Sequence, residues 1–73
     1  MFRKKKINNE REICARAISK QYGTTKSLYI AENKDKDGYV SFWSLGDIIL
    51  MALMEYSESA VPKVYIYEFY SKN

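Results

Sequence analysis

The chain has 73 residues, of which 47% are hydrophobic and 15% aromatic, so it is too apolar for a disordered tail and too short for a second core. Its 12 Lys or Arg and 9 Asp or Glu give a net charge of +3, and it contains no histidine and a single cysteine, Cys14. This composition excludes an internal disulfide and a histidine-based catalytic or metal site, and it is typical of a protein from a reducing compartment.

The charge is unevenly distributed along the chain. Residues 1–26 carry eight Lys or Arg against two Glu, a net charge of +6, whereas residues 27–73 carry a net charge of −3. No apolar segment follows the cations at residues 3–6, and the longest apolar run is too short to cross a bilayer, so we expect no signal peptide, no membrane contact and a cytoplasmic location. We predict a basic N-terminal arm at residues 1–8 and a single α+β domain at residues 9–73.

The first predicted element is an amphipathic helix at residues 10–22. Apolar residues recur there at spacings of three and four, at Ile13, Cys14, Ala17, Ile18 and Tyr22. Gly23 predicts the end of the helix, in the left-handed conformation. Because Cys14 belongs to the apolar stripe, we expect it to be a small buried hydrophobe and not a reactive thiol.

Two β-prone segments follow, at residues 26–32 and 39–43. The polar stretch between them ends in Asp37-Gly38, a strong turn sequence, so the two segments predict a hairpin.

A second helix is predicted at roughly residues 48–58, capped by Asp47 and ended by the approach to Pro62. Residues 63–70 are β-branched and aromatic almost throughout and predict a strand. The predicted order is therefore α-β-β-α-β. It describes a small two-layer α+β domain in which a three-stranded, mainly antiparallel sheet has two helices on one face.

The polar stretch between the hairpin strands has the spacing of a calcium loop. Loop positions 1, 3, 5, 6, 8 and 9 are occupied by Asn33, Asp35, Asp37, Gly38, Val40 and Ser41. On these residues the segment 33–44 resembles the twelve-residue loop of the EF-hand family, and the resemblance implies a Ca²⁺ site. That family places a bidentate glutamate at position 12, where this chain has Ser44. We therefore predict a plain hairpin loop with no metal and no cofactor, and we keep a degenerate calcium site as a minor alternative.

The cations of the first 20 residues are the candidate partner-binding residues. They are Arg3, Lys4, Lys5, Lys6, Arg11, Arg16 and Lys20. A basic stripe of this kind suits an acidic macromolecular surface. Because Glu10 and Glu12 would repel a phosphate backbone along the helix, a protein partner is favoured over nucleic acid.

The residues expected to self-associate lie in the second half of the chain. A helix over residues 48–54 would be apolar all round, and a domain of this size cannot cover such a helix on both sides. Large apolar residues also occupy both faces of the strand predicted at residues 63–70. We therefore predict a homo-oligomer, such as a dimer, built on Leu50, Met51, Met54, Tyr65 and Tyr67.

No catalytic residue is predicted, because the chain lacks the side-chain combinations of nucleophile and general base that catalysis needs. We expect a small non-enzymatic binding protein that inhibits or regulates a protein or ribonucleoprotein partner by occupying it. An inhibitor or regulator of the kind that viruses and mobile elements encode is the class we expect. The alternative is direct nucleic-acid binding through the basic arm and the first helix.

Overall fold

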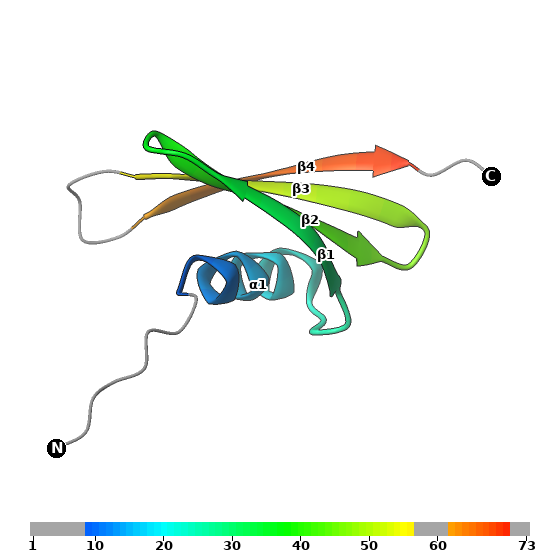
Figure 1. The fold of residues 1–73 in the computed structure, drawn as a ribbon. Helices are drawn as coiled ribbons and strands as arrows, with labels where there is room; N and C mark the ends of the chain where they lie inside the picture. The colour runs from blue at the N-terminus through cyan, green and yellow to red at the C-terminus, as the bar shows by residue number, and fades with distance from the viewer. Residues whose placement is uncertain (1–8, 57–61, 71–73) are drawn as a thin grey trace, which may run out of the picture.

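One helix and four strands make up the fold, in the order α-β-β-β-β. A computed structural model describes residues 9–56 and 62–70 (Figure 1). The elements are α1 (Asn9–Tyr22), β1 (Leu28–Lys34), β2 (Gly38–Leu45), β3 (Ile48–Glu55) and β4 (Lys63–Tyr70). Each strand pairs antiparallel with the next one along the chain, so the sheet is a four-stranded meander.

Three of the predicted elements are confirmed: the first helix, the hairpin and the last strand. α1 ends as predicted, because Gly23 has a φ of 69° and its amide donates a hydrogen bond to the Ser19 carbonyl over 2.8 Å. Within residues 9–56 and 62–70, no helix is long and apolar enough to cross a membrane.

The predicted second helix is wrong, and with it the predicted three-stranded sheet under two helices. Residues 48–55 form β3, a central strand paired on both sides. A short apolar run fits a strand buried on two faces as well as it fits a buried helix, and the pattern alone does not separate the two. Asp47 caps no helix but shares a two-residue hairpin turn with Gly46, whose φ of 61° suits the first position of a type II′ turn.

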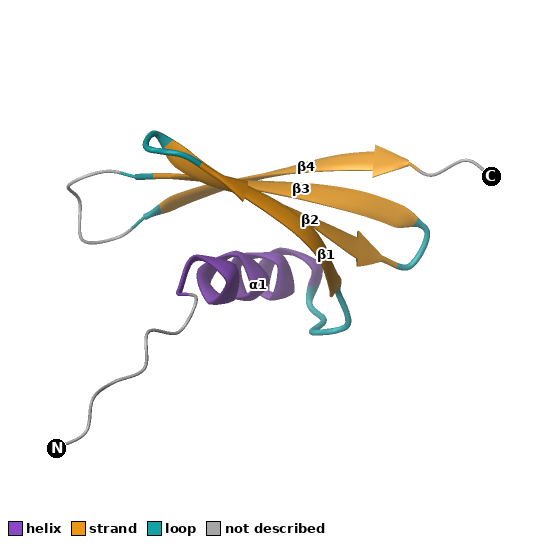
Figure 2. Ribbon diagram, in the orientation of Figure 1, coloured by secondary structure: helices purple, strands orange, loops and turns teal. Residues whose placement is uncertain are grey.

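The core lies between α1 and one face of the sheet (Figure 2). Alternate residues of the two central strands point into it and are buried under the helix. The buried set consists of Cys14 and Ile18 from α1, Tyr39, Ser41 and Trp43 from β2, and Leu50, Ala52 and Met54 from β3. The expectation that Cys14 is buried is thus confirmed.

Polar contacts fix both ends of α1 against the sheet. In the first turn, Glu10 lies 3.4 Å from the Lys34 ammonium and accepts a hydrogen bond from the Tyr56 hydroxyl over 3.1 Å. In the last turn, the Tyr22 hydroxyl donates to the Glu68 carboxylate of β4. Because the two ends are held by different strands, the helix has a defined orientation across the sheet.

The two-sided character of β3 can be tested with one residue type. Leu50 is fully buried under α1, whereas Leu53 points to the other face and is half-buried. We expect Leu50→Ala to lower the free energy of unfolding by about 2–5 kcal/mol and Leu53→Ala to lower it by clearly less. Urea denaturation followed by Trp43 fluorescence at sub-micromolar protein measures both. Equal losses would contradict the strand geometry.

Candidate functional site

The side of the sheet that faces away from α1 is apolar across all four strands. Its residues fall into three rows of the strand register. The first row is Leu28, Ser44, Ile49 and Phe69, the second is Ala31, Phe42, Met51 and Tyr67, and the third is Asn33, Val40, Leu53 and Tyr65. We call these residues the open face. None of them is charged, and α1 packs on the opposite side of the sheet (Figure 1).

Large apolar side chains of the open face are accessible to solvent. Leu28, Tyr67 and Phe69 are exposed by 67%, 45% and 43%. Those of β3 on this face are half-buried, because neighbouring side chains shield one another. An antiparallel sheet with one wet face ordinarily places polar residues on that face. A contiguous apolar surface of this extent is typical of an interaction site.

The structure divides the five residues predicted to self-associate between the two sides of the sheet. Leu50 and Met54 are 0% and 5% exposed and lie beneath α1, so they belong to the core. Met51, Tyr65 and Tyr67 lie on the open face, where they occupy the second and third rows. Only these three are placed where another molecule can reach them.

Several members of the open face were not among the residues predicted to bind a partner or to self-associate. Ile49 and Leu53 were missed because residues 48–58 were predicted as a helix, so their side chains were not assigned to a face of the sheet. Phe42 lies in a predicted strand, but its place on the open face follows only from its pairing with Met51 of β3. Residues 48–54 are all apolar, which fits a central strand between two apolar environments as well as a buried helix. The sequence therefore held no local signal that separated the open-face residues of this segment from its core residues.

Arg11 belongs to a polar cluster at the junction of α1 and β1. Its guanidinium carbon lies 3.8 Å from the centroid of the Tyr29 ring, and a guanidinium nitrogen lies 3.5 Å from a carboxylate oxygen of Glu32. Tyr29 in turn meets the Trp43 ring edge-on, with the ring centroids 5.6 Å apart. The cation therefore makes a cation–π contact and an ion pair within the chain, although 41% of its side chain stays exposed.

The predicted basic stripe does not form one surface in the described residues. Arg16 and Lys20 are exposed on the outer face of α1, next to the exposed Glu12, whereas Arg11 turns toward β1. Arg16 and Glu12 also line an open hollow of about 230 Å³ between α1, the loop that precedes β1 and Trp43 of β2. Four further predicted partner-binding residues, Arg3, Lys4, Lys5 and Lys6, lie outside the described residues.

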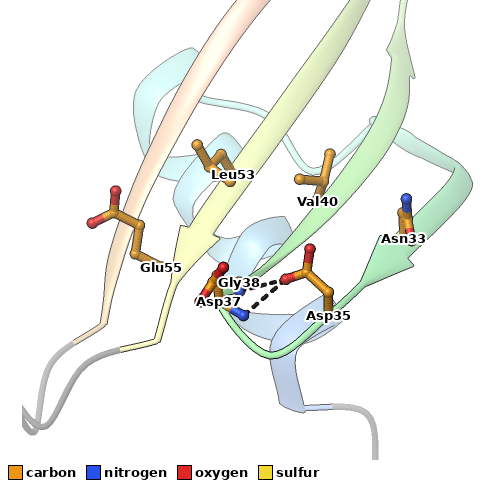
Figure 3. Close-up of a pocket in the computed structure, with 7 residues that line it drawn as sticks. All are labelled: Asn33, Asp35, Asp37, Gly38, Val40, Leu53 and Glu55. Carbon is orange, nitrogen blue, oxygen red and sulfur yellow. Dashed lines mark hydrogen bonds between the residues drawn. The ribbon is translucent and has the colours of Figure 1, made fainter.

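The segment that resembles a calcium loop is a β-hairpin turn. Figure 3 shows Asp35 accepting hydrogen bonds from the backbone amides of Asp37 and Gly38, over 2.8 and 3.0 Å, which is an Asx turn. Asn33 lies on the open face, whereas Ser41 is buried on the opposite face and accepts a hydrogen bond from the Trp43 indole. The loop oxygens thus point to different sides of the sheet.

An open hollow of about 240 Å³ borders this turn and includes the exposed Glu55 (Figure 3). Among the described residues, no group of three or more His, Cys, Asp or Glu side chains has the geometry to hold a metal ion.

Burial and hydrogen bonding shift the pKa values of the cluster at β1. Burial raises the pKa of Tyr39, and the hydrogen bond that its hydroxyl donates to Glu32 over 2.5 Å raises it further. The same hydrogen bond is the largest influence on Glu32 and holds the pKa of that carboxyl below its ordinary value, while partial desolvation opposes it and the Arg11 charge supports it. At neutral pH the cluster therefore has an ionised Glu32 and a protonated Tyr39.

We expect the hydrogen bond between Tyr39 and Glu32 to make stability depend on pH. The folded-state pKa of Glu32 is lowered, so its stabilising effect is present above the ordinary value of 4.5 and is lost as the pH falls through the folded-state pKa. Urea denaturation should show Tyr39→Phe less stable than the wild type near pH 7, with the difference shrinking on acidification. Glu32→Gln removes the titrating group and serves as the control. A difference that grows in acid would contradict this assignment.

We expect Ca²⁺ to leave the protein unchanged. Millimolar Ca²⁺ should alter neither the Trp43 fluorescence nor the melting temperature, because Asp35 already accepts two backbone hydrogen bonds. Asp35→Ala should lower the free energy of unfolding by about 0.5–1.5 kcal/mol without calcium, since the turn loses those bonds. A sub-millimolar transition that Asp35→Ala abolishes would establish the calcium site instead.

Two surfaces of opposite character therefore stand out in the described residues: the uncharged open face, and the outer face of α1 with Arg16 and Lys20. No protein-family model, curated protein or solved structure matches the chain.

Proposed function

We propose that this chain is a small non-enzymatic binding protein that inhibits or regulates a macromolecular partner by occupying it, and that protein–protein contact takes place on the open face. The supporting observation is the absence of charge from all three rows of that face, which are fully described. Protein interfaces are depleted of charge at their centres and enriched in aromatic residues and Met, as this face is.

The chemistry of the open face favours a protein occupant over nucleic acid. Aromatic side chains on a sheet can stack on bases, but a nucleic-acid groove also needs cations that follow the phosphates. The open face has aromatic rings, including Phe42, Tyr67 and Phe69, without a cation among them. An apolar protein surface needs no such charges.

The exposed cations of α1 form a second contact region in the same proposal. Arg16 and Lys20 lie on the outer face of α1, on the opposite side of the molecule from the open face. They suit an acidic surface on the partner, where long-range attraction speeds association. The alternative function, nucleic-acid binding through the arm and α1, depends on these cations. It is weakened because Arg11 is already paired with Glu32.

A reducing, cytoplasmic setting is part of the proposal. It is supported by the single cysteine, since a secreted domain of this size ordinarily depends on disulfides. Burial raises the pKa of the Cys14 thiol, which keeps it protonated and unreactive. The Cys14 side chain therefore packs in the core as a reduced thiol.

The affinity for nucleic acid and its dependence on salt concentration distinguish the proposed protein-binding function from the nucleic-acid alternative. We expect duplex DNA and single-stranded RNA to bind the full chain with a dissociation constant weaker than about 1 µM at physiological salt, measured by fluorescence anisotropy. Sub-micromolar binding that falls by several decades over a tenfold rise in salt would favour the alternative. In that case Arg16→Ala would reduce the log–log slope by about one.

Partner binding through the open face can be tested by titrating a purified partner against variants of the chain. A protein captured by the immobilised chain is identified, purified and titrated against the wild type, Tyr67→Lys and the control Gln21→Lys, which adds the same charge on an exposed part of α1. We expect Tyr67→Lys to weaken binding about tenfold or more and the control to leave it unchanged. Equal affinity of all three proteins would contradict binding through the open face.

A further inference from the structure

We propose that the occupant of the open face is a second copy of this chain, so that two sheets stack face to face about a two-fold axis. The inference rests on the proposed function, which assigns protein contact to that face. It names the partner at that site. Sheets pack about 10 Å apart in such sandwiches, and side chains of the two inner faces interdigitate.

The charge pattern of the open face suits self-pairing. A two-fold interface brings the same residues of both copies together, so a charged residue near the axis would lie close to the same charge in the other copy. The three rows contain none, and the register pair Glu55 and Lys63 lies just beyond them at one end of the sheet. Two copies can therefore approach without like-charge repulsion across the rows.

The distribution of residue types from centre to edge also fits an interface. Phe42 and Met51 pair in the middle row of the two central strands, at the centre of the open face. Tyr65 and Tyr67 lie on the edge strand β4, where a phenol can pack its ring inward and keep its hydroxyl in water. Asn33, on the opposite edge, is polar, whereas Leu28 and Phe69 make both edges of the first row apolar. The apolar centre with a wet rim that is usual in protein–protein contacts is thus formed on the side of Asn33, Tyr65 and Tyr67.

The size of the open face predicts a dimer of moderate affinity. Four strands about 4.8 Å apart and six residues at about 3.3 Å each give a flat footprint on the order of 400 Å² per copy. Protruding side chains raise the accessible area above this footprint. Two faces together thus approach the roughly 1,200 Å² at which specific interfaces begin. We accordingly expect dissociation in the micromolar range.

Pairing through a sheet edge would not cover this surface. β1 is protected at its edge by a register shift at Ile30 and by the charged residues Glu32 and Lys34. β4 pairs with β3 without a shift, so its outer edge is the better candidate for strand addition. An edge-to-edge dimer, however, would place two open faces side by side and leave both of them uncovered. Face-to-face stacking removes both from water.

Stacking also leaves the second contact region free. In the face-to-face dimer the two copies of α1 lie on opposite outer surfaces, each with Arg16 and Lys20 exposed. The dimer therefore presents two cationic surfaces to acidic partners. Two linked contacts of this kind strengthen binding when one partner can reach both of them.

The test is the mass of the full chain in solution, by sedimentation and light scattering from low micromolar to near-millimolar concentration. We expect the wild type to pass from 8.6 kDa to twice that value. Met51→Lys should remain at 8.6 kDa, and Tyr67→Lys should raise the dissociation constant about tenfold or more. The control Gln21→Lys should behave like the wild type.

Tyr67→Lys covers the case in which Met51→Lys does not fold, and a measurement of particle shape distinguishes face-to-face stacking from edge pairing. If circular dichroism shows Met51→Lys unfolded, Tyr67→Lys decides, because its side chain is 45% exposed and a lysine there can reach water in the monomer. Small-angle scattering should give a compact dimer. An elongated particle indicates edge pairing and overturns the proposal, as does a dimer that both variants leave intact.

The result also separates this inference from the proposed function. A chain that stays monomeric at near-millimolar concentration overturns the second copy as occupant. If that monomer still loses its captured partner on Tyr67→Lys, protein contact through the open face stands. If Tyr67→Lys affects neither self-association nor partner binding, both proposals fail.

Discussion

A single helix can cover only one face of a sheet, and this sheet is apolar on both. The constraint is clearest in β3, where Leu50, Ala52 and Met54 are buried under α1 and the alternate residues Ile49, Met51 and Leu53 face the other way. Burying the first set gives the domain its core. The second set keeps an unfavourable contact with water that another molecule can relieve. The proposed binding function follows from this imbalance.

The polar contacts around α1 explain why the helix lies where it does. Arg11 stacks on Tyr29 and pairs with Glu32, and Tyr39 donates to the same carboxylate from within the core. Hydrogen bonds to charged groups are stronger than neutral ones. This cluster fastens one flank of α1 to β1, and it pairs within the chain one of the cations that the sequence suggested for partner binding.

The molecule consequently has two sides with different physical chemistry. Contact on the open face would depend on apolar burial and would respond little to salt. Contact on the outer face of α1, where Arg16 and Lys20 are exposed, would be screened by salt and would mainly govern the rate of association. A small protein can thus combine a site for stable assembly with a site for attraction.

Local patterns in the sequence determined the first helix, the Asp35–Gly38 turn, the last strand and the burial of Cys14, because these depend on spacing and turn residues within a few positions. They left residues 48–55 undecided, since an apolar run fits a buried helix or a two-sided strand equally well. Only tertiary structure decided between them. Pairing with β2 and β4 satisfies the backbone of β3 and sends its side chains to opposite faces. That pairing sent Leu50 and Met54 to the core and Met51 to the surface, and it gathered Phe42, Met51 and Tyr67 into one row of the open face from three strands that no local pattern could align.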